Sequence, residues 1–568
     1  MTGTTGRYAL LEQLAADGVE YIFGNPGTVE QGFLDALEDI PRLCYIMALQ
    51  ETVAVAAADG YARATKRPAV VQLHSGVGLG NGVGMMYQAK RGEAPLVVLA
   101  GESGLRYDAM DAQMAADLVA IAEPVTKWAT RVVHPSSLLR VVRRAMKIAA
   151  TPPMGPVFVS LPMDVLDAPS EEEVVPTSYP VTRVAPENAL VYRAAAMLAG
   201  ASRPLLIVGD GIAASGAQSE LAKVAELAGA EIWEANGSEV NISAAHPQYR
   251  GALGHMFGDH SREITRASDV ILISGTYVFP EVFPALHGVF AHGAQVIHID
   301  LNGYEIAKNF PVDLGIVSDP KATLGQLATA LEQVMTSAQR DAARQRAFGL
   351  GEAKKRELAA QKKSDESARD SVPMHASRFM AELASQLSAD AVIFDEALTT
   401  SPELTRYLTP TLPGHYFQTR GGSLGVGFPG AIGLKLAHPD KTVIGFSGDG
   451  GAMYTPQALW TAAHHNLDVK FVVCNNRSYR ILKHNIQQYW HERDLEERDF
   501  PHPFDITSPN IDFAGLATSV GVESTRVETP DQVGPAISQA LTHSGPFLID
   551  LVISGEVANH FVYVKAGQ

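Results

Sequence analysis

Residues 442–476 read TVIGFSGDGGAMYTPQALWTAAHHNLDVKFVVCNN, and this stretch decides the fold class. An apolar run ends in SGDGG (447–451), a helical pattern follows, and a second apolar run ends in NN (475–476). Short strands rich in Val and Ile that alternate with helices are typical of a parallel sheet buried on both faces. The stretch therefore predicts a strand–helix–strand unit whose two strands end at the same edge of one sheet.

The same alternation runs through the whole chain. Comparable apolar runs, separated by amphipathic stretches, recur at 19–24, 68–74, 94–101, 156–162, 204–210, 269–275, 295–300, 391–396 and 546–553. The Pro-, Ser- and Glu-rich residues 166–190 and the charged residues 336–373 break this pattern and predict linkers. We therefore expect an α/β protein built from three doubly wound parallel-sheet domains. The predicted domains are 1–165, 190–335 and 374–555, followed by a tail over 556–568.

Composition excludes several classes of protein. The 568 residues carry 45 Lys and Arg against 62 Asp and Glu, a net charge of −17, which disfavours general binding to nucleic acid or to anionic membranes. The two cysteines, Cys44 and Cys474, are too few for a disulfide framework or a four-cysteine zinc site. No stretch resembles a signal peptide or a membrane span, so we expect a cytoplasmic protein.

The SGDGG and NN segments predict an ion-binding edge. Ligands of parallel α/β sheets gather at the carboxyl ends of the strands, where glycines and helix N-termini accommodate phosphate groups. A carboxylate from Asp449 and an amide oxygen from the NN pair are ligands that suit Mg²⁺. A lone GDG is usually only a tight turn, and Gly209-Asp210-Gly211 also follows a strand but has no NN after it.

The combined GDG…NN pattern resembles the signature of thiamine-diphosphate (ThDP) enzymes. The resemblance implies that Asp449, Asn476 and the backbone carbonyl of Ser478 bind Mg²⁺, which clamps the diphosphate. It also implies cofactor contacts from Gly450, Gly451, Asn476 and Tyr479.

A second segment resembles the pyrimidine-binding domain of the same family. LQETVAVAAADGYAR (49–63) places Glu51 at the start of a helix, and PAVVQLHSGVGLGNG (68–82) follows as a strand and a glycine turn. The turn lacks the full G-x-G-x-x-G of a dinucleotide site, which argues against NAD(P). The resemblance makes Glu51 the residue that hydrogen-bonds the pyrimidine ring and favours the imino tautomer that activates the cofactor. The three predicted domains are then pyrimidine-binding, central and diphosphate-binding.

Two further segments of the third predicted domain resemble cofactor-binding parts of the family. RGGSLGVGFPGAIG (420–433) is similar to the segment that bends the cofactor, which places Leu424 under the bend. DEALTTSPEL (395–404) is similar to the stretch whose hydroxyls meet the diphosphate, here Thr399 and Thr400. The family also implies a homo-oligomer, at least a dimer and usually a tetramer, whose sites are shared between subunits.

Within the family, the chain is most similar to benzoylformate decarboxylases. FGNPGTVEQ (23–31) places Thr28 at the position of a substrate-binding serine, and His74 falls on a catalytic histidine. The implied reaction removes CO₂ from a small 2-oxo acid through a cofactor carbanion/enamine and releases an aldehyde. A histidine can supply the protonation that this reaction requires.

Two departures keep other reactions open. The second catalytic histidine of those decarboxylases has no counterpart, because Val282 or a neighbour stands there and His287 lies a few residues away. The charged segment 483–505 is also longer than expected, although the possible acid–base residues His491, Glu492 and Glu496 fit a solvated, ion-paired helix better.

Three alternatives remain open, and the departures favour the first two. An acetolactate-synthase-like carboligase and a 2-hydroxyacyl-CoA lyase would use the same cofactor, and the latter needs a basic groove for which Arg250, Arg262 and Arg266 are available. The third is a cofactor-free binding protein, which should lack Glu51 or the metal ligands.

Overall fold

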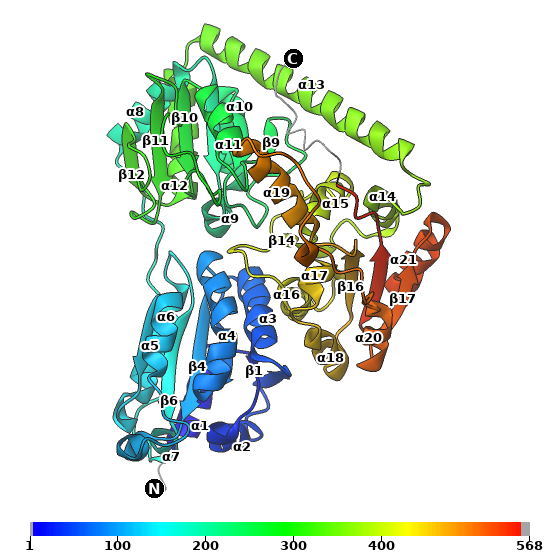
Figure 1. Cartoon of the computed structure of the whole chain (residues 1–568). Helices are drawn as coiled ribbons and strands as arrows, with labels where there is room; N and C mark the ends of the chain where they lie inside the picture. Colours follow the sequence, from blue (N-terminus) through cyan, green and yellow to red (C-terminus); the bar gives the residue numbers. More distant parts are fainter. Residues whose placement is uncertain (1–3, 558–568) are drawn as a thin grey trace.

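The computed structural model describes residues 4–557, and Figure 1 shows three bodies, each built around a twisted sheet with helices on both faces. Each body contains one six-stranded sheet, and every strand pair is parallel. The predicted fold class, three doubly wound α/β sheets, is confirmed. Most of the predicted tail, residues 558–568, lies outside the described part of the chain, and the predicted domain boundaries stay a prediction.

The first sheet has the order β2-β1-β3-β4-β6-β5. Its strands are β1 Tyr21–Gly24, β2 Cys44–Met47, β3 Ala69–His74, β4 Leu96–Glu102, β5 Trp128–Arg131 and β6 Val157–Pro162. Its helices are α1 Gly6–Ala16, α2 Gln31–Leu37, α3 Glu51–Thr65, α4 Ser75–Arg91, α5 Leu118–Ala122, α6 Leu138–Ala150 and α7 Met163–Asp167, with 3₁₀ turns η1 Thr28–Glu30, η2 Leu105–Met110, η3 Glu123–Val125 and η4 Pro135–Ser137. The central strands β3 and β4 are buried along almost their whole length, as their Val- and Leu-rich sequences predict.

The second sheet has the order β12-β11-β10-β7-β8-β9. The strand order changes direction between β10 and β7, although these two strands are parallel. Its strands are β7 Pro204–Val208, β8 Glu231–Glu234, β9 Tyr249–Ala252, β10 Val270–Ser274, β11 Gln295–Asp300 and β12 Leu314–Val317. Its helices are α8 Asn188–Ala199, α9 Gly211–Ser215, α10 Gln218–Ala228, α11 Asp259–Arg266 and α12 Pro320–Val334.

The third sheet has the order β14-β13-β15-β16-β18-β17, which repeats the topology of the first sheet strand for strand. Its strands are β13 Val392–Glu396, β14 Tyr416–Gln418, β15 Val443–Gly448, β16 Val469–Asn475, β17 Glu523–Val527 and β18 Phe547–Val552. Its helices are α14 Ala376–Gln386, α15 Ser401–Tyr407, α16 Gly427–Ala437, α17 Asp449–Ala452, α18 Gln457–His464, α19 Arg480–Glu492, α20 Phe513–Ser519 and α21 Val533–Thr542, with η5 Leu398–Thr400, η6 His502–Phe504 and η7 Pro530–Gln532.

The first and third bodies pack directly against each other through α3 and α16 (Figure 1). A Cβ added at Gly60 would overlap the carbonyl oxygen of Gly430, and one added at Gly433 would overlap that of Ala57. The two helices therefore approach to backbone contact. Glycine normally weakens a helix interior, so these positions exchange local helix stability for close packing.

The two predicted linkers take different forms. The chain from 171 to 187 has neither helix nor strand, whereas residues 337–367 form the single long helix α13, Ser337–Ser367, opened by a capping box at Thr336. Figure 1 shows α13 running from the central body to the third. No helix within residues 4–557 is long and apolar enough to cross a membrane.

Candidate functional site

The carboxyl edge of the third sheet brings Asp449 and Asn476 together. Asp449 opens α17 directly after β15, and Asn476 follows the neighbouring strand β16. The backbone N–H of Ser478 donates to Asp449 Oδ2 at 3.3 Å and to Asn476 Oδ1 at 3.0 Å. The turn between them requires a positive φ of 57° at Arg477. The two side-chain oxygens therefore converge on one point, as the spacing of the two segments predicts.

The chemistry of this edge fits a hard cation. Asp449 is 3% exposed, and burial raises the pKa of its carboxyl to about 6. Bringing a cation to this carboxylate would offset the cost of burying its charge. Within residues 4–557, no group of three or more His, Cys, Asp and Glu side chains forms an alternative metal cluster. One carboxylate, one amide oxygen and a backbone carbonyl oxygen are therefore the donors that could hold Mg²⁺.

The glycines after Asp449 leave room for a close neighbour. A Cβ at Gly450 would overlap the ring of Tyr479, and one at Gly451 would lie 3.0 Å from the Ser447 hydroxyl oxygen. Tyr479 is itself fixed by its backbone N–H, which donates to the carbonyl of Phe504 at 3.0 Å. The two glycines therefore let the Tyr479 ring and the Ser447 hydroxyl pack directly against the backbone of this turn.

Thr399 and Thr400 lie at the end of β13, on the same edge. The guanidinium of Arg480 donates to the Thr399 hydroxyl at 2.9 Å and to the Thr399 carbonyl at 2.8 Å. The Thr400 hydroxyl is buried and has no hydrogen-bond partner within the described chain. Sequence reasoning missed Arg480, because an arginine four residues after an Asn has no motif of its own. Its positive charge makes this edge more favourable for a diphosphate.

The loop that carries Leu424 is held by a buried carboxylate. Glu396 is 0% exposed and accepts the backbone N–H groups of Gly425 at 2.6 Å and Gly427 at 2.7 Å, together with the Ser447 hydroxyl at 3.2 Å. Burial raises the pKa of Glu396 to about 7. Leu424 itself is half-buried in the chain. Glu396 was not identified from the sequence, since its partners lie 29 to 51 positions away.

The equivalent edge of the first sheet presents Glu51. This residue opens α3 and is 7% exposed. Asn81 donates to Glu51 Oε2 at 3.0 Å and Asn25 to Oε1 at 3.4 Å. A Cβ at Gly78 would come within 3.1 Å of Oε1. Two amide groups therefore fix the orientation of a carboxyl that has little space around it.

Thr28 and His74 lie close to Glu51 on this edge. His74 Nδ1 is 2.9 Å from Glu30 Oε2, and the other oxygen of Glu30 accepts the Gly101 N–H at 3.0 Å. A Cβ at Gly27 would overlap the His74 ring, so the turn that begins with Thr28 packs against the imidazole. Burial raises the pKa of Glu30, and its ionised form requires the proton on His74 Nδ1. His74 Nε2 then remains available to exchange a proton.

Val282, which stands at the position predicted for a second catalytic histidine, lies on the central body. Val282 is 58% exposed, and His287 is exposed farther along the same loop. The backbone N–H of Val282 donates to the carbonyl of His255 at 3.0 Å, so an exposed histidine distant in sequence lies beside this position. The stacking of Phe257 on Phe283 fixes the two segments together.

The arginines considered for a nucleotide groove are largely committed elsewhere. Arg250 pairs with Glu357 of α13 at 2.8 Å, and Arg262 pairs with Asp259 within α11. A cavity of about 570 Å³ between the first and central bodies is lined by other cations, among them Lys90, Arg91, Lys127 and Arg183, but also by Glu93, Asp300, Glu305 and Asp319.

The charged segment 483–505 is a helix followed by irregular chain. Trp490 is buried and stacks on Phe500 with ring centroids 6.1 Å apart. His491, Glu492 and Glu496 are exposed in the chain. Their exposure agrees with a solvated surface rather than with a buried acid–base group.

The two edges remain separate within one chain. The hydrogen bonds of Glu51 and His74 described above stay in the first body, and those of Asp449 and Asn476 stay in the third. No hydrogen bond described above joins the residues of one edge to those of the other.

Comparison with known proteins identifies the family of all three bodies. Family models described as the N-terminal TPP binding domain, the central domain and the C-terminal TPP binding domain of thiamine pyrophosphate enzymes match residues 4–121, 191–327 and 399–551. The chain belongs to the thiamine diphosphate enzyme family. Glu51 and His74 fall in the first matched domain, and Asp449 and Asn476 in the third.

Relatives of this thiamine diphosphate enzyme cover almost its whole length. A benzoylformate decarboxylase of Pseudomonas aeruginosa is 30% identical over 96% of this chain and 98% of its own. A probable acetolactate synthase large subunit of Methanococcus aeolicus is 28% identical over 96% and 92% of the two chains. A solved 4-hydroxybenzoylformate decarboxylase of Rhodococcus jostii, described as thiamine diphosphate-dependent, superimposes with a TM-score of 0.83 at 25% identity, covering 98% of this chain and 100% of its own.

Proposed function

We propose that the protein is a ThDP- and Mg²⁺-dependent lyase that decarboxylates a small 2-oxo acid to an aldehyde. The observation that carries the proposal is the cluster on the first sheet edge, where a His74–Glu30 pair and Thr28 lie beside an oriented Glu51. Such an edge combines a fixed carboxyl with an imidazole able to move a proton. The relatives named benzoylformate decarboxylase support the same reaction class.

In this proposal, the edge of the third sheet binds and orients the cofactor. Asp449, Asn476 and the Ser478 carbonyl would hold Mg²⁺, and the turn at Gly450 and Gly451 would receive the diphosphate. The hydroxyls of Thr399 and Thr400, with Arg480 behind them, add donors and positive charge. Leu424 would support the bend of the cofactor, held in place through Glu396. Thiamine diphosphate, when bound, supplies the nucleophilic carbon and the electron sink that side chains lack.

In this proposal, the edge of the first sheet supplies the residues that donate and accept protons. Glu51, oriented by Asn25 and Asn81, would hydrogen-bond the pyrimidine ring. His74 would donate or accept a proton at Nε2, with Nδ1 fixed by Glu30. Thr28 would hydrogen-bond the substrate carboxylate. General acid–base catalysis of this kind contributes about 10²–10⁴-fold in rate.

The complete site is proposed to form between subunits of a homodimer or a homotetramer. Each chain carries both half-sites, and their hydrogen bonds remain within separate bodies. Mixing a Glu51→Gln variant with an Asp449→Ala variant tests this arrangement. In a mixed dimer, one shared site combines both intact residues, so activity should recover to about a quarter of the parent's if subunits exchange at random. No recovery after verified subunit exchange would contradict shared sites.

The substrate class is tested by measuring CO₂ and aldehyde release across aryl and alkyl 2-oxo acids, with 2-hydroxyacyl-CoA thioesters in parallel. Release of CO₂ with an equal amount of aldehyde supports the proposal. Carbon dioxide with a condensed product that carries a hydroxyl and a ketone on adjacent carbons instead identifies a carboligase, and cleavage of the thioester alone identifies a CoA lyase. Failure of the protein to bind ThDP with Mg²⁺ would leave a non-catalytic binding protein.

A further inference from the structure

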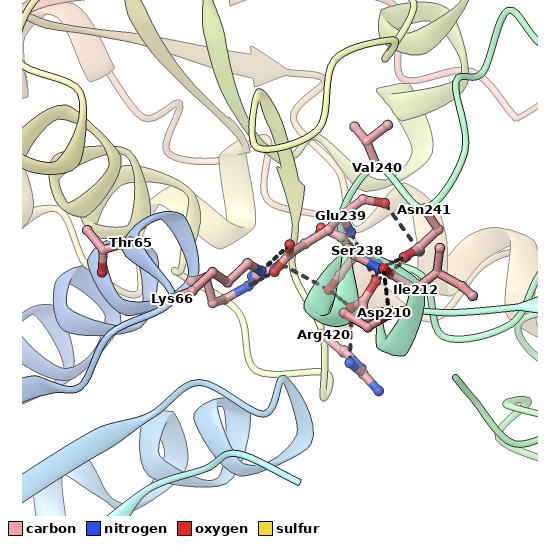
Figure 2. A network of polar contacts seen from close by, with 12 residues as sticks. Thr65, Lys66, Asp210, Ile212, Ser238, Glu239, Val240, Asn241 and Arg420 are labelled. Atoms are coloured by element: carbon pink, nitrogen blue, oxygen red, sulfur yellow. Dashed lines mark hydrogen bonds and ion pairs between the residues drawn. The ribbon is translucent and has the colours of Figure 1, made fainter. Parts of the chain in front are cut away.

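The second GDG segment, Gly209-Asp210-Gly211, has no place in the site described above, yet Asp210 is the centre of a buried polar network (Figure 2). Its Oδ1 accepts the N–H groups of Ser238 at 2.9 Å and Glu239 at 3.2 Å, and the Asn241 amide at 3.0 Å. Its Oδ2 accepts the Ser238 hydroxyl and, at 3.0 Å, a guanidinium N–H of Arg420. Four of these bonds lie within the central body, but the last one reaches the third.

Arg420 begins the loop that carries Leu424. The loop contains Gly421, Gly422 and Gly425 with φ of 98°, 82° and 87°. Three glycines with positive φ within five residues give this backbone many alternative conformations, so its order must come from contacts outside the loop.

Contacts from all three bodies provide that order. Glu396 holds the N–H of Gly425 at the far end of the loop, and the Ser423 hydroxyl donates to the carbonyl of Gly84 at 2.9 Å. At the near end, Arg420 is bound to Asp210. Leu424 thus lies between anchors from the third, first and central bodies.

The strand before the loop is bound to the same central segment. The N–H of Gln418 donates to the carbonyl of Ser238 at 2.7 Å. Arg63 of α3 donates to both carbonyls, that of Ser238 at 2.9 Å and that of Gln418 at 3.0 Å. The segment that Asp210 fixes therefore extends the edge of the third sheet and directs the chain into the loop.

The charges favour this arrangement. Burial alone would raise the pKa of Asp210, but Arg420 and then Arg63 lower it below its ordinary value, so the carboxylate is ionised at neutral pH. A guanidinium and a carboxylate that are both largely buried form a directional contact. Removal of either group would leave the charge of the other buried without an opposite charge beside it.

We propose that Asp210 of the central body, through Arg420, is a positioning residue for Leu424 and so prepares the third edge to receive the cofactor. This rests on the proposed role of Leu424 beneath ThDP. It assigns to the second GDG segment a function in ordering the loop, distinct from metal binding.

The test compares loop order before any cofactor is added. Hydrogen exchange of backbone amides at 419–427 in cofactor-free protein should be about tenfold faster in Arg420→Ala and Asp210→Asn, with the strand 204–208 as an internal reference for the integrity of the central body. Arg420→Lys should restore part of the protection. Lys66→Ala is the matched control, because Lys66 pairs with Glu239 in the same network but does not contact the loop. It should change exchange by less than about twofold.

Cofactor binding gives the second readout. Isothermal titration with ThDP and Mg²⁺ should show an about tenfold higher Kd for Arg420→Ala, and the double variant with Asp210→Asn should be no weaker than the worse single variant. Unchanged loop exchange and unchanged Kd in Arg420→Ala would overturn the proposal, as would an equal effect of Lys66→Ala. If the parent protein binds no ThDP, the proposed function fails, while the exchange data still decide whether Asp210 orders the loop.

Discussion

The first and third sheets share one topology but present opposite chemistry at the same edge. In each sheet, residues from three places meet at the carboxyl ends of the strands. The first place follows the first strand, the second is at or just before the helix that precedes the third strand, and the third is the end of the third strand. These positions are Thr28, Glu51 and His74 in the first sheet, and Thr399, Leu424 and Asp449 in the third. The first edge therefore carries ionisable side chains, whereas the third carries glycines, hydroxyls and oxygen donors.

The difference shows that two sheets of the same topology can present different side chains at the same edge. The fold decides which loops meet, and the residue types decide what those loops bind. At the first edge, side chains hold other side chains, as Glu30 holds His74. At the third edge, side chains mostly hold backbone, as Glu396 holds the amides of Gly425 and Gly427. A reactive group needs orientation, and a phosphate site needs a shaped backbone.

The largest effect is expected from Asp449→Ala. Loss of the carboxylate removes the only side-chain charge among the proposed metal donors, so Mg²⁺-dependent retention of ThDP should be abolished. Titration of the metal-depleted protein and analysis of co-purified cofactor measure this. Asp390→Ala, a surface carboxylate of the same body, should bind like the parent. A variant at position 449 that still purifies with full ThDP would refute the ligand assignment.

Glu51→Gln should separate the two edges. The amide keeps the size of the side chain, so ThDP binding at the third edge should be retained, while turnover should fall about 10²–10⁴-fold because the ring loses its acid–base partner. Steady-state kinetics and titration on the same preparation provide both numbers. Near-normal turnover would remove Glu51 from the mechanism.

His74→Ala should have a smaller effect on the same edge. We expect turnover to fall at least about tenfold, equivalent to about 1.4 kcal/mol of barrier, because another group or water must carry the proton. The KM of the substrate should change less than kcat. A decrease in turnover of less than about tenfold would mean that His74 only packs against Gly27.

The smallest predicted effect concerns pH. Burial raises the pKa of Glu30, so its carboxyl gains a proton at a higher pH than an exposed glutamate as the solution is acidified. Protonation removes the negative charge that keeps the proton on His74 Nδ1. The acid limb of the kcat/KM profile should therefore lie above pH 4.5, about the ordinary pKa of glutamate, and should weaken in Glu30→Gln. An identical acid limb in the variant would assign it to another group.

The sequence predicted the candidate site best where the site residues lie in short segments directly after strands. The spacing of Asp449 and Asn476 was readable because each follows a strand, and neighbouring parallel strands end together. The sheets followed from Val- and Ile-rich runs, since these are needed on both faces of a buried strand.

The remaining contacts join residues far apart in the chain. Arg480 on Thr399 and Asp210 on Arg420 span 81 and 210 positions, and neither pair has a pattern that marks it in advance. Glu30 looked like an ordinary residue of the FGNPGTVEQ segment until the fold placed it against His74. Such pairs depend on tertiary packing, which local periodicity does not encode.

The backbone contact between α3 and α16 has a geometric consequence. Because Gly60 meets Gly430 without a side chain in between, the distance from one half-site to the other within a subunit is set by the thickness of two bare helices. A methyl group at Gly60 would overlap the Gly430 carbonyl, and one at Gly433 would overlap the Ala57 carbonyl, so either substitution should push the two bodies apart. These glycines therefore fix the spacing between the two sheet edges on which the proposed shared sites would depend.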